Sequence, residues 1–483
     1  MLKKLVGETA VYGLSTIIGR SLNFLLVPFY TDPRVFQAEQ YGVVTELYAY
    51  AAFLNIVFTF GMETTYFRFS NKIGADPIKV FRNIQSMLII STIILCAPVL
   101  LLSEQIASSL QYPGKGHFFI TLVSLIGIDT LLALSFAKLR QEGKAKKFAT
   151  VKLFNILLNI GLNVLFLVVL PKMHPSFHVR VEYVLYANLI ANFSQIIFFP
   201  KDIIDWFRFS FSLLLSKQYL AYGFPLMIMG LAGMVNELID RTVLKFLLPD
   251  NFYPGVTKLA ALGIYGACYK LSIFMSLGLQ AFRYAAEPFF FAQAKDKNSP
   301  ELYARVMHYF TIVCCSVLLL ISFNLQWIQF LLGSPEFRTG IFVVPILLLA
   351  NLFLGTYYNL SIWYKLTDKT NYGMWISIGG GLLTVSLNFV LIPRLGYEGC
   401  AWATLCCYAA MTLASYLLGH KYYPVPYKTS YLLFCICLCG AVSITFWNLQ
   451  LSTELLHNLL YKNAIGAAFL LLLFVIGKKV KAL

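Results

Sequence analysis

Apolar residues occur along this chain in long uninterrupted runs, and charged residues gather in the short gaps between them. A hydrocarbon core of about 30 Å is crossed by about 20 helical residues at 1.5 Å each. The pattern therefore predicts an all-α integral membrane protein with fourteen transmembrane helices. The runs are 9–30, 41–67, 80–102, 117–137, 148–170, 181–199, 219–248, 259–292, 303–323, 341–364, 372–392, 397–418, 430–447 and 463–476.

Successive gaps alternate in charge. Six Lys and Arg residues crowd positions 138–152, whereas the next gap holds only Lys172 and Arg180. Gaps on the side of the N-terminus hold about 25 Lys and Arg, against about 8 on the other side, and the positive-inside rule converts this into an orientation. Both termini are expected in the cytoplasm. The apolar run after Lys3 and Lys4 is too long for a cleaved signal peptide and predicts a first spanning helix.

Weak internal similarity indicates a duplicated core. A shift of 224 residues carries Tyr41-Gly42 onto Tyr265-Gly266 and Glu63 onto Glu287. Each half would hold six helices, and an even number makes both halves enter the membrane in the same direction. We therefore expect six-helix bundles at 1–215 and 216–425, related by a pseudo-twofold axis along the membrane normal, with two appended helices at 426–483.

Composition excludes most other classes. The 483 residues are 59% hydrophobic and only 12% charged, and the mean hydropathy is +0.71. The net charge of +16 does not predict a nucleic-acid partner, because the basic residues are not gathered on one polar surface. The ten cysteines include no CxxC pair and fall mainly inside apolar runs, so they are expected to be small buried residues rather than disulfides or metal ligands.

Ionisable residues inside the predicted helices carry the functional signal. Each would cost about 2.5–3.5 kcal/mol at a helix centre facing lipid, so all of them together would cost on the order of 30 kcal/mol. They are therefore expected to face protein or water. The eleven are Arg20, Glu46, Glu63, Asp129, Glu237, Asp240, Arg241, Lys245, Lys270, Arg283 and Glu287.

Their spacing predicts polar stripes. Arg20 and Asn23 lie on one face of the first helix, and Glu237, Arg241 and Lys245 follow one another at four-residue steps. The predicted second half carries four bases against three acids, and a cavity wall with spare cations suits an anionic substrate.

Structural explanations remain open for several of these residues. Glu237 with Arg241, and Arg283 with Glu287, have the spacing of intrahelical ion pairs. Near the outer boundary, long side chains can also extend to the interface instead of lining a cavity; this alternative applies to Glu46 and Lys245. Arg20, Asp129 and Lys270 have no charged neighbour on their own helix and are stronger functional candidates.

Several motifs resemble those of a known family. They are Arg20, the run 25–31, Glu39-Gln40-Tyr41-Gly42, Asp240-Arg241, and Leu387-Asn388 to Pro393 followed by Gly396 and Gly399. Together they resemble bacterial O-antigen and capsule flippases, the polysaccharide transporter branch of the superfamily that also holds multidrug and toxin extrusion proteins and lipid II flippases. The chain departs from that pattern at Asp32-Pro33, which precede Arg34 and are expected to lengthen an outer loop.

The resemblance implies a function. It implies a flippase, not an enzyme, that moves an undecaprenyl-diphosphate-linked oligosaccharide across the bacterial inner membrane by alternating access, for lipopolysaccharide O-antigen or capsule. In lipid II flippases, arginines of helices one and eight bind the diphosphate, and Arg20 and Arg283 match them. The expected substrate-binding set is Arg20, Arg283, Lys270, Arg241 and Asn23, and the expected ion-coupling or gating set is Asp129, Asp240, Glu63, Glu287 and Glu237.

No cofactor or metal is expected beyond a proton or sodium gradient as energy source. The expected partners are membrane lipids and the polysaccharide polymerase and export machinery, with the chain itself a monomer. Alternatives are a cation-coupled multidrug exporter or a lipid II-type flippase of the same superfamily, a membrane-embedded sugar polymerase or ligase, and a passive scramblase or scaffold. A large periplasmic loop would favour the enzyme, and transport that ignores ion gradients would favour the scramblase.

Overall fold

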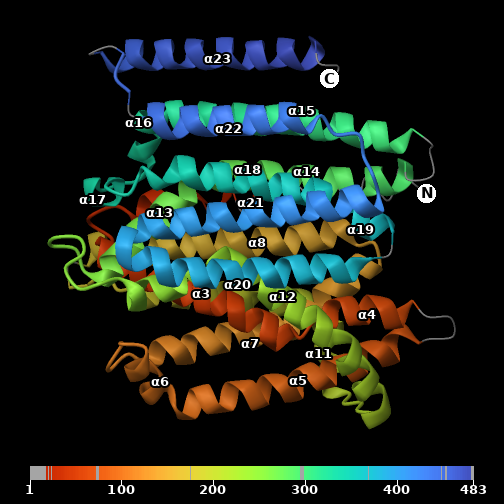
Figure 1. Cartoon of the computed structure of the whole chain (residues 1–483). Helices are drawn as coiled ribbons and strands as arrows, with labels where there is room; N and C mark the ends of the chain where they lie inside the picture. Colours follow the sequence, from red (N-terminus) through yellow and green to blue (C-terminus); the bar gives the residue numbers. More distant parts are fainter. Residues whose placement is uncertain are drawn as a thin grey trace. The chain divides into compact units, whose positions relative to one another are not determined.

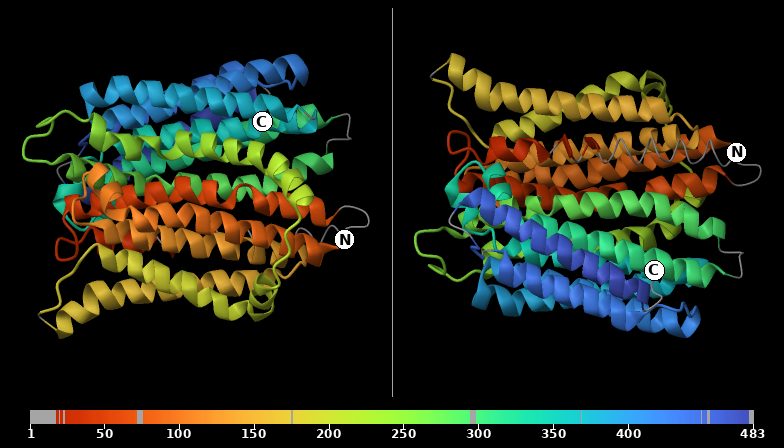
Figure 2. Two further views of the ribbon diagram at one scale, coloured as in Figure 1. Left: turned by 90° about the horizontal axis from the view of Figure 1, so that it is seen from below. Right: turned by 90° about the horizontal axis from the view of Figure 1, so that it is seen from above.

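The computed structural model describes residues 18, 19, 21, 22, 24–71, 76–174, 176–293, 298–367, 369–447, 449–451 and 454–479, except for seven side chains within helices. In this part of the chain every regular element is a helix (Figure 1). Within each of the two compact units described below, long helices run side by side, as two further views show (Figure 2).

Most predicted transmembrane helices are confirmed. Among the described residues, eleven helices are long and apolar enough to span a membrane, or up to thirteen if each of two bent pairs is one span. These thirteen coincide with the predicted runs from 41–67 onwards. The first predicted helix, 9–30, lies largely outside the described residues, so the count of fourteen stays a prediction.

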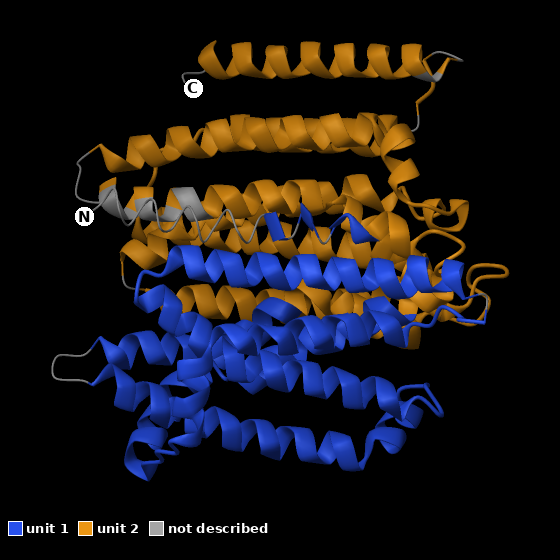
Figure 3. Ribbon diagram, turned by 180° about the vertical axis from the view of Figure 1, so that it is seen from behind, with its two compact units in different colours: residues 1–26, 43–234 blue, residues 27–42, 235–483 orange. Residues whose placement is uncertain are grey.

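The chain forms two compact units (Figure 3), one holding residues 43–234 with those before 27, the other holding 27–42 and 235–483. Among the described helices, three pass from one unit to the other: α2 (Leu26–Tyr30), by its first residue only, α3 (Ala38–Thr59) and α12 (Leu213–Leu247). The predicted division at 215 and 425 rests on an internal repeat, which packing alone does not test.

The first unit consists of helices joined by short connections. Its remaining elements are α4 (Met62–Ser70), α5 (Pro77–Leu101), α6 (Ser103–Ser109), α7 (Gly116–Gln141), α8 (Ala145–Val164), the π-helical segment η1 (Leu165–Val169), α9 (Leu170–Met173), α10 (Glu182–Ser194), the 3₁₀ turn η2 (Gln195–Phe198) and α11 (Pro200–Phe207).

The second unit has the same character. Its elements are α2 (Leu26–Tyr30), α13 (Lys258–Leu271), α14 (Ile273–Gln293), α15 (Ser299–Phe323), α16 (Leu325–Ile328), η3 (Gln329–Leu331), α17 (Pro335–Arg338), α18 (Val343–Leu360), α19 (Ile362–Leu366), α20 (Thr370–Leu395), α21 (Tyr397–Tyr422), α22 (Thr429–Phe446) and α23 (Leu455–Lys479).

Local sequence fixes where helices start and bend. Asp76 caps α5, accepting a hydrogen bond from the Ile78 amide at 2.9 Å, and Pro77 occupies the first helical turn, where its missing N–H costs nothing. Pro200 cannot donate to the preceding turn, and there α11 bends from α10 by 89°. A second bend, of 48°, separates α13 from α14.

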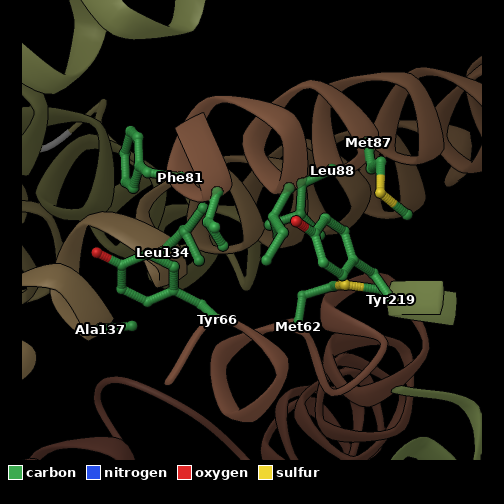
Figure 4. Packing of buried hydrophobic residues seen from close by; sticks show 10 residues of the cluster. Met62, Tyr66, Phe81, Met87, Leu88, Leu134, Ala137 and Tyr219 are labelled. Carbon is green, nitrogen blue, oxygen red and sulfur yellow. The ribbon is translucent and has the colours of Figure 1, made fainter. Parts of the chain in front are cut away.

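Glycine allows α3 and α4 to meet at a tight kink. Gly61 has φ +68°, a left-handed conformation that a residue with a Cβ adopts only with strain. A Cβ at this position would also lie 2.9 Å from Cβ of Leu226 on α12. The kink directs α4 into the core of the first unit, where Met62 and Tyr66 pack against Phe81, Leu134 and Tyr219 (Figure 4).

The start of α3 makes an unusually close contact within the second unit. A Cβ placed on Gly42 would lie 2.0 Å from the carbonyl oxygen of Leu259, and one on Gly263 would lie 1.9 Å from that of Ala38. The backbones of α3 and α13 therefore touch directly. In a membrane, where apolar burial does not drive helices together, such small-residue contacts provide van der Waals packing.

Candidate functional site

In the second unit, α12 places Asp240 inside the protein. The side chain is only 2% exposed. Its carboxylate accepts a hydrogen bond from the Tyr265 hydroxyl on α13 at 2.5 Å and another from the backbone N–H of Arg241 at 2.8 Å. These donors fix the carboxylate without a close cationic partner.

Arg241, the next residue, stands over an aromatic ring. Its guanidinium carbon lies 3.8 Å from the ring centroid of Tyr269, one turn after Tyr265 on α13. The Nε–H is buried and has no hydrogen-bond partner among the described residues. A cation over a ring face keeps the N–H donors at the edge of the guanidinium available, so Arg241 can still bind an anion.

Arg283 on α14 repeats this arrangement. Its exposed guanidinium lies 5.1 Å from the ring centroid of Tyr358 on α18. Lys270, at the end of α13, is also exposed. The Glu287 side chain lies outside the described residues, so the alternative of an Arg283–Glu287 pair is not tested.

Glu237 lies one turn before Arg241 on α12, and its side chain is exposed. It interacts electrostatically with Arg241 and with the phenols of Tyr269 and Tyr358. No close ion pair joins Glu237 to Arg241, although both side chains are described. The electrostatic field around the two arginines thus includes one exposed carboxylate.

The alternative that the side chains of Glu46 and Lys245 extend to the membrane interface is wrong. Glu46 is fully buried and accepts hydrogen bonds from the hydroxyls of Tyr50 and Tyr112. Lys245 is 4% exposed. Both charged groups therefore remain inside the protein, because neighbouring side chains surround them before they reach an interface.

In the first unit, Asp129 on α7 belongs to a chain of amides. It accepts a hydrogen bond from Asn192 on α10 at 2.7 Å, and the side-chain oxygen of Asn192 accepts one from Asn155 on α8 at 2.8 Å. Lys152, one turn before Asn155, interacts electrostatically with Asp129. The network can respond to protonation, because a neutral Asp129 would no longer attract Lys152.

Three cations of the first unit are paired with carboxylates. Arg140 pairs with Glu63. Arg82 places Nε and Nη2 at 2.9 and 2.7 Å from Oδ1 of Asp205. Lys138 similarly pairs with Asp202 at 2.6 Å. These contacts hold α4, α5, α7 and α11 together.

The expected site residues therefore separate into groups. Around α12–α14 the structure gathers Arg241, Asp240, Glu237 and Arg283 with their tyrosine neighbours. Asp129 and Glu63 lie in the first unit, with partners of their own. Arg20 and Asn23 lie outside the described residues, so their predicted roles stay predictions.

The partners of these residues do not follow from the sequence pattern. Lys152 was assigned to a cytoplasmic gap, yet it lies in the second turn of α8, with its ammonium 4.0 Å from the ring centroid of Phe136. A signal was available for α10, where Asn188 and Asn192 recur four residues apart inside an apolar run. For Tyr358 no local spacing could have shown its position beside Arg283.

Solved structures share this fold. The lipid II flippase MurJ in an inward closed conformation matches at a TM-score of 0.68 and 15% identity, covering 97% of this chain and 98% of that one. An inward-facing multidrug resistance MATE family transporter of the MOP superfamily matches at a TM-score of 0.66 and 14% identity, and the match covers 83% of this chain and 94% of that one. An outward-facing MATE family transporter matches at a TM-score of 0.56 and 16% identity, and the match covers 86% of this chain and 94% of that one. At these identities the likeness shows the fold.

The chain thus has the fold of these multi-pass membrane proteins. Residues 5–292 match the model of the family described as polysaccharide biosynthesis protein, and the chain belongs to that family. The resemblance noted in the sequence is therefore confirmed. No curated protein sequence matches the chain.

Proposed function

We propose that this protein flips an undecaprenyl-diphosphate-linked oligosaccharide, an O-antigen, capsule or exopolysaccharide repeat unit, from the cytoplasmic to the periplasmic leaflet by alternating access. The observation that carries the proposal is the set of groups that surround two arginines in the second unit. Arg241 and Arg283 lie over tyrosine rings, and no described carboxylate lies within ion-pair distance of either. Planar guanidinium groups suit diphosphate oxygens, which accept several charge-assisted hydrogen bonds.

A cation exporter is the second candidate. Such a protein would place accessible acids in its cavity, and Glu237 is one exposed carboxylate in the second unit. Arg241 next to it raises the electrostatic cost of a bound cation, which favours the anionic substrate.

We propose further that a proton or sodium gradient acts through Asp129 or Asp240. Both are held by neutral donors, Asn192 and Tyr265, rather than by a close cationic partner. A carboxylate of this kind changes its interactions when it binds a cation, and that difference can shift the population of two access states.

Deleting the gene tests the substrate class. Undecaprenyl-linked glycan should accumulate on the cytoplasmic face, and drug sensitivity should stay unchanged. Complementation with wild type should clear the glycan, whereas Arg241→Ala and Arg283→Ala should clear it poorly at equal protein levels. Drug sensitivity without accumulated glycan would favour the cation exporter instead.

The orientation that we propose places both termini in the cytoplasm of a bacterial inner membrane. In a background without native cysteines, an external thiol reagent should label cysteines introduced at Pro113, Asn251 and Pro335. It should not label Lys146→Cys or Lys421→Cys in intact cells, and labelling there would overturn the orientation.

A further inference from the structure

Amide side chains form a stripe along α8 in the first unit. Asn155, Asn159 and Asn163 recur at four-residue steps, so they share one face of the helix. On the opposite face Phe154 and Leu157 are 37% and 59% exposed. In a spanning helix such exposed apolar residues suit lipid, whereas unpaired amides do not, because hydrocarbon offers them no hydrogen-bond partner. The amide face therefore has to meet protein or water.

The neighbouring helix α10 also presents amides to this face. Asn155 donates to the side-chain oxygen of Asn192 at 2.8 Å. Because α8 and α10 pack against each other and, as consecutive spans, run in opposite directions, one turn forward on α8 corresponds to one turn back on α10. Asn159 therefore lies at the level of Asn188, which donates to the hydroxyl of Tyr48 on α3 at 2.8 Å.

Three polar groups in this region have no hydrogen-bond partner among the described residues. They are the side-chain oxygens of Asn155 and Asn188 and the side-chain NH2 group of Asn159. All three side chains are half-buried, so a bound molecule can reach them without unfolding the unit. Asn159 and Asn188 also lie near the middle of the predicted spans 148–170 and 181–199, the depth at which transporters bind their substrates.

Charge does not single out an ion as the partner of these amides. Asp129, which accepts a hydrogen bond from Asn192 at 2.7 Å, and Lys152 have opposite charges and interact with each other. Their fields largely cancel for a molecule at the amides. A neutral molecule rich in hydroxyl groups fits better, because each hydroxyl both donates and accepts, as the set of amide oxygens and NH2 groups requires. The glycan of the proposed substrate is such a molecule.

We propose that Asn155, Asn159 and Asn188 bind hydroxyl groups of the glycan and make transport depend on which sugars the lipid carries. The inference rests on the proposed function, in which arginines of the second unit bind the diphosphate. Without substrate, water satisfies the three amides, and sugar hydroxyls displace it. A site built from hydrogen-bonding groups discriminates between substrates because its own groups stay unpaired when a matching hydroxyl is absent.

Binding of two lipid probes to the purified full chain tests the proposal. The probes are undecaprenyl diphosphate and the same lipid linked to the oligosaccharide recovered from the deletion strain. The wild type should bind the glycan-linked probe about tenfold more tightly. Asn159→Leu should weaken binding of that probe about two- to tenfold and leave binding of bare undecaprenyl diphosphate unchanged. The variant should fold, because Asn163 still donates to the backbone carbonyl oxygen of residue 159, at 2.8 Å in the wild type.

Leu157→Ala, on the opposite face of α8, is the matched control and should change neither affinity. Arg241→Ala should weaken binding of both probes. Equal affinity of the wild type for the two probes would overturn the inference. So would an Asn159→Leu variant that weakened both probes equally, or neither, while Arg241→Ala weakened both, and the proposed function would then stand. A deletion strain without the glycan-linked lipid, or a wild type that bound neither probe, would overturn the proposed function and this inference together.

Discussion

Two sets of cations, one in each unit, have different partners, although the first unit also holds cations over rings, such as Lys152 over Phe136. In the first unit Arg82, Lys138 and Arg140 reach carboxylates on neighbouring helices. In the second unit Arg241 and Arg283 reach tyrosine rings. A carboxylate neutralises a cation, whereas an aromatic ring positions it and leaves its charge and donors in place. The first arrangement joins helices, and under the proposed function the second provides a binding surface for an anion.

The largest effect is expected from removing a ring-positioned cation. Arg241→Ala should weaken binding of a diphosphate-linked lipid about 10- to 150-fold, because one charge-assisted hydrogen bond contributes about 1.5–3 kcal/mol. Binding to the purified protein measures this effect. Unchanged affinity in a well-folded variant would break the contrast between the units.

Arg283 separates charge from shape. Arg283→Lys keeps the charge but loses the planar fork and the contact with Tyr358, so binding should fall about 5- to 20-fold, less than for Arg283→Ala. Arg140→Lys in the first unit is the matched control and should leave binding unchanged. If Arg140→Lys weakened binding as much as Arg283→Lys, the arginine beside a ring in the second unit would not differ in its role from the ion-paired arginine of the first unit.

In the first unit, breaking a pair should affect folding rather than binding. Arg82→Ala removes both hydrogen bonds that Oδ1 of Asp205, 15% exposed, accepts from Arg82, leaves only Arg208 at 3.9 Å, and should cost about 1–3 kcal/mol of stability. Thermal unfolding in detergent measures the cost. Adding Asp205→Asn should recover part of it, and a double variant as unstable as the single one would contradict a specific pair.

The two internal acids should differ from these pairs. Asp129→Asn keeps a side-chain oxygen for Asn192, so stability should change by less than about 1 kcal/mol. Asp240→Asn likewise keeps an acceptor for Tyr265. Transport by at least one variant should lose its response to a proton or sodium gradient. Unchanged gradient dependence in both would exclude these groups from coupling.

The smallest effect concerns the Asp32-Pro33 loop. Arg34 donates to both carboxylate oxygens of Asp32, at 3.0 and 2.8 Å. This hydrogen bonding lowers the pKa of Asp32. The stabilisation is therefore present above the unfolded pKa of about 4 and is lost as pH falls through the lower folded value.

Because Arg34 is largely exposed, Asp32→Asn should lower the stability only slightly near pH 7 and not at all below the folded pKa. Unfolding curves at neutral and acid pH compare the two conditions. A cost that persists at low pH would mean that the loop depends on contacts other than this ion pair.

The pattern of apolar residues predicted the helices but not where they bend. Runs of apolar residues predict spans well, because lipid demands helical hydrogen bonding throughout the hydrocarbon region. The 89° turn at Pro200 could have been expected from the proline. The 48° bend at Ser272 could not, since no proline or glycine marks it.

The candidate site was predicted as a set of charges without partners. The excess of bases in the second half followed from counting, and helical spacing placed Glu237 and Arg241 on one face. That Arg241 lies over Tyr269 depends on how α12 meets α13, which one helix's spacing does not encode. Lys152 illustrates the same limit. A lysine near a helix end has the same sequence context whether its ammonium faces water or interacts with Asp129.

The crossing of Gly42 and Gly263 has a mechanical consequence. Helices that interlock through side chains have discrete registers, because a knob must leave its hole before the helices can turn. At Gly42 and Gly263 the nearest facing atoms belong to the backbone of the other helix, so no knob sits in a hole at these two positions. A methyl group added at Gly42 or Gly263 would lie 2.0 or 1.9 Å from a carbonyl oxygen and would force the two helices apart, which would change the angle at which they cross.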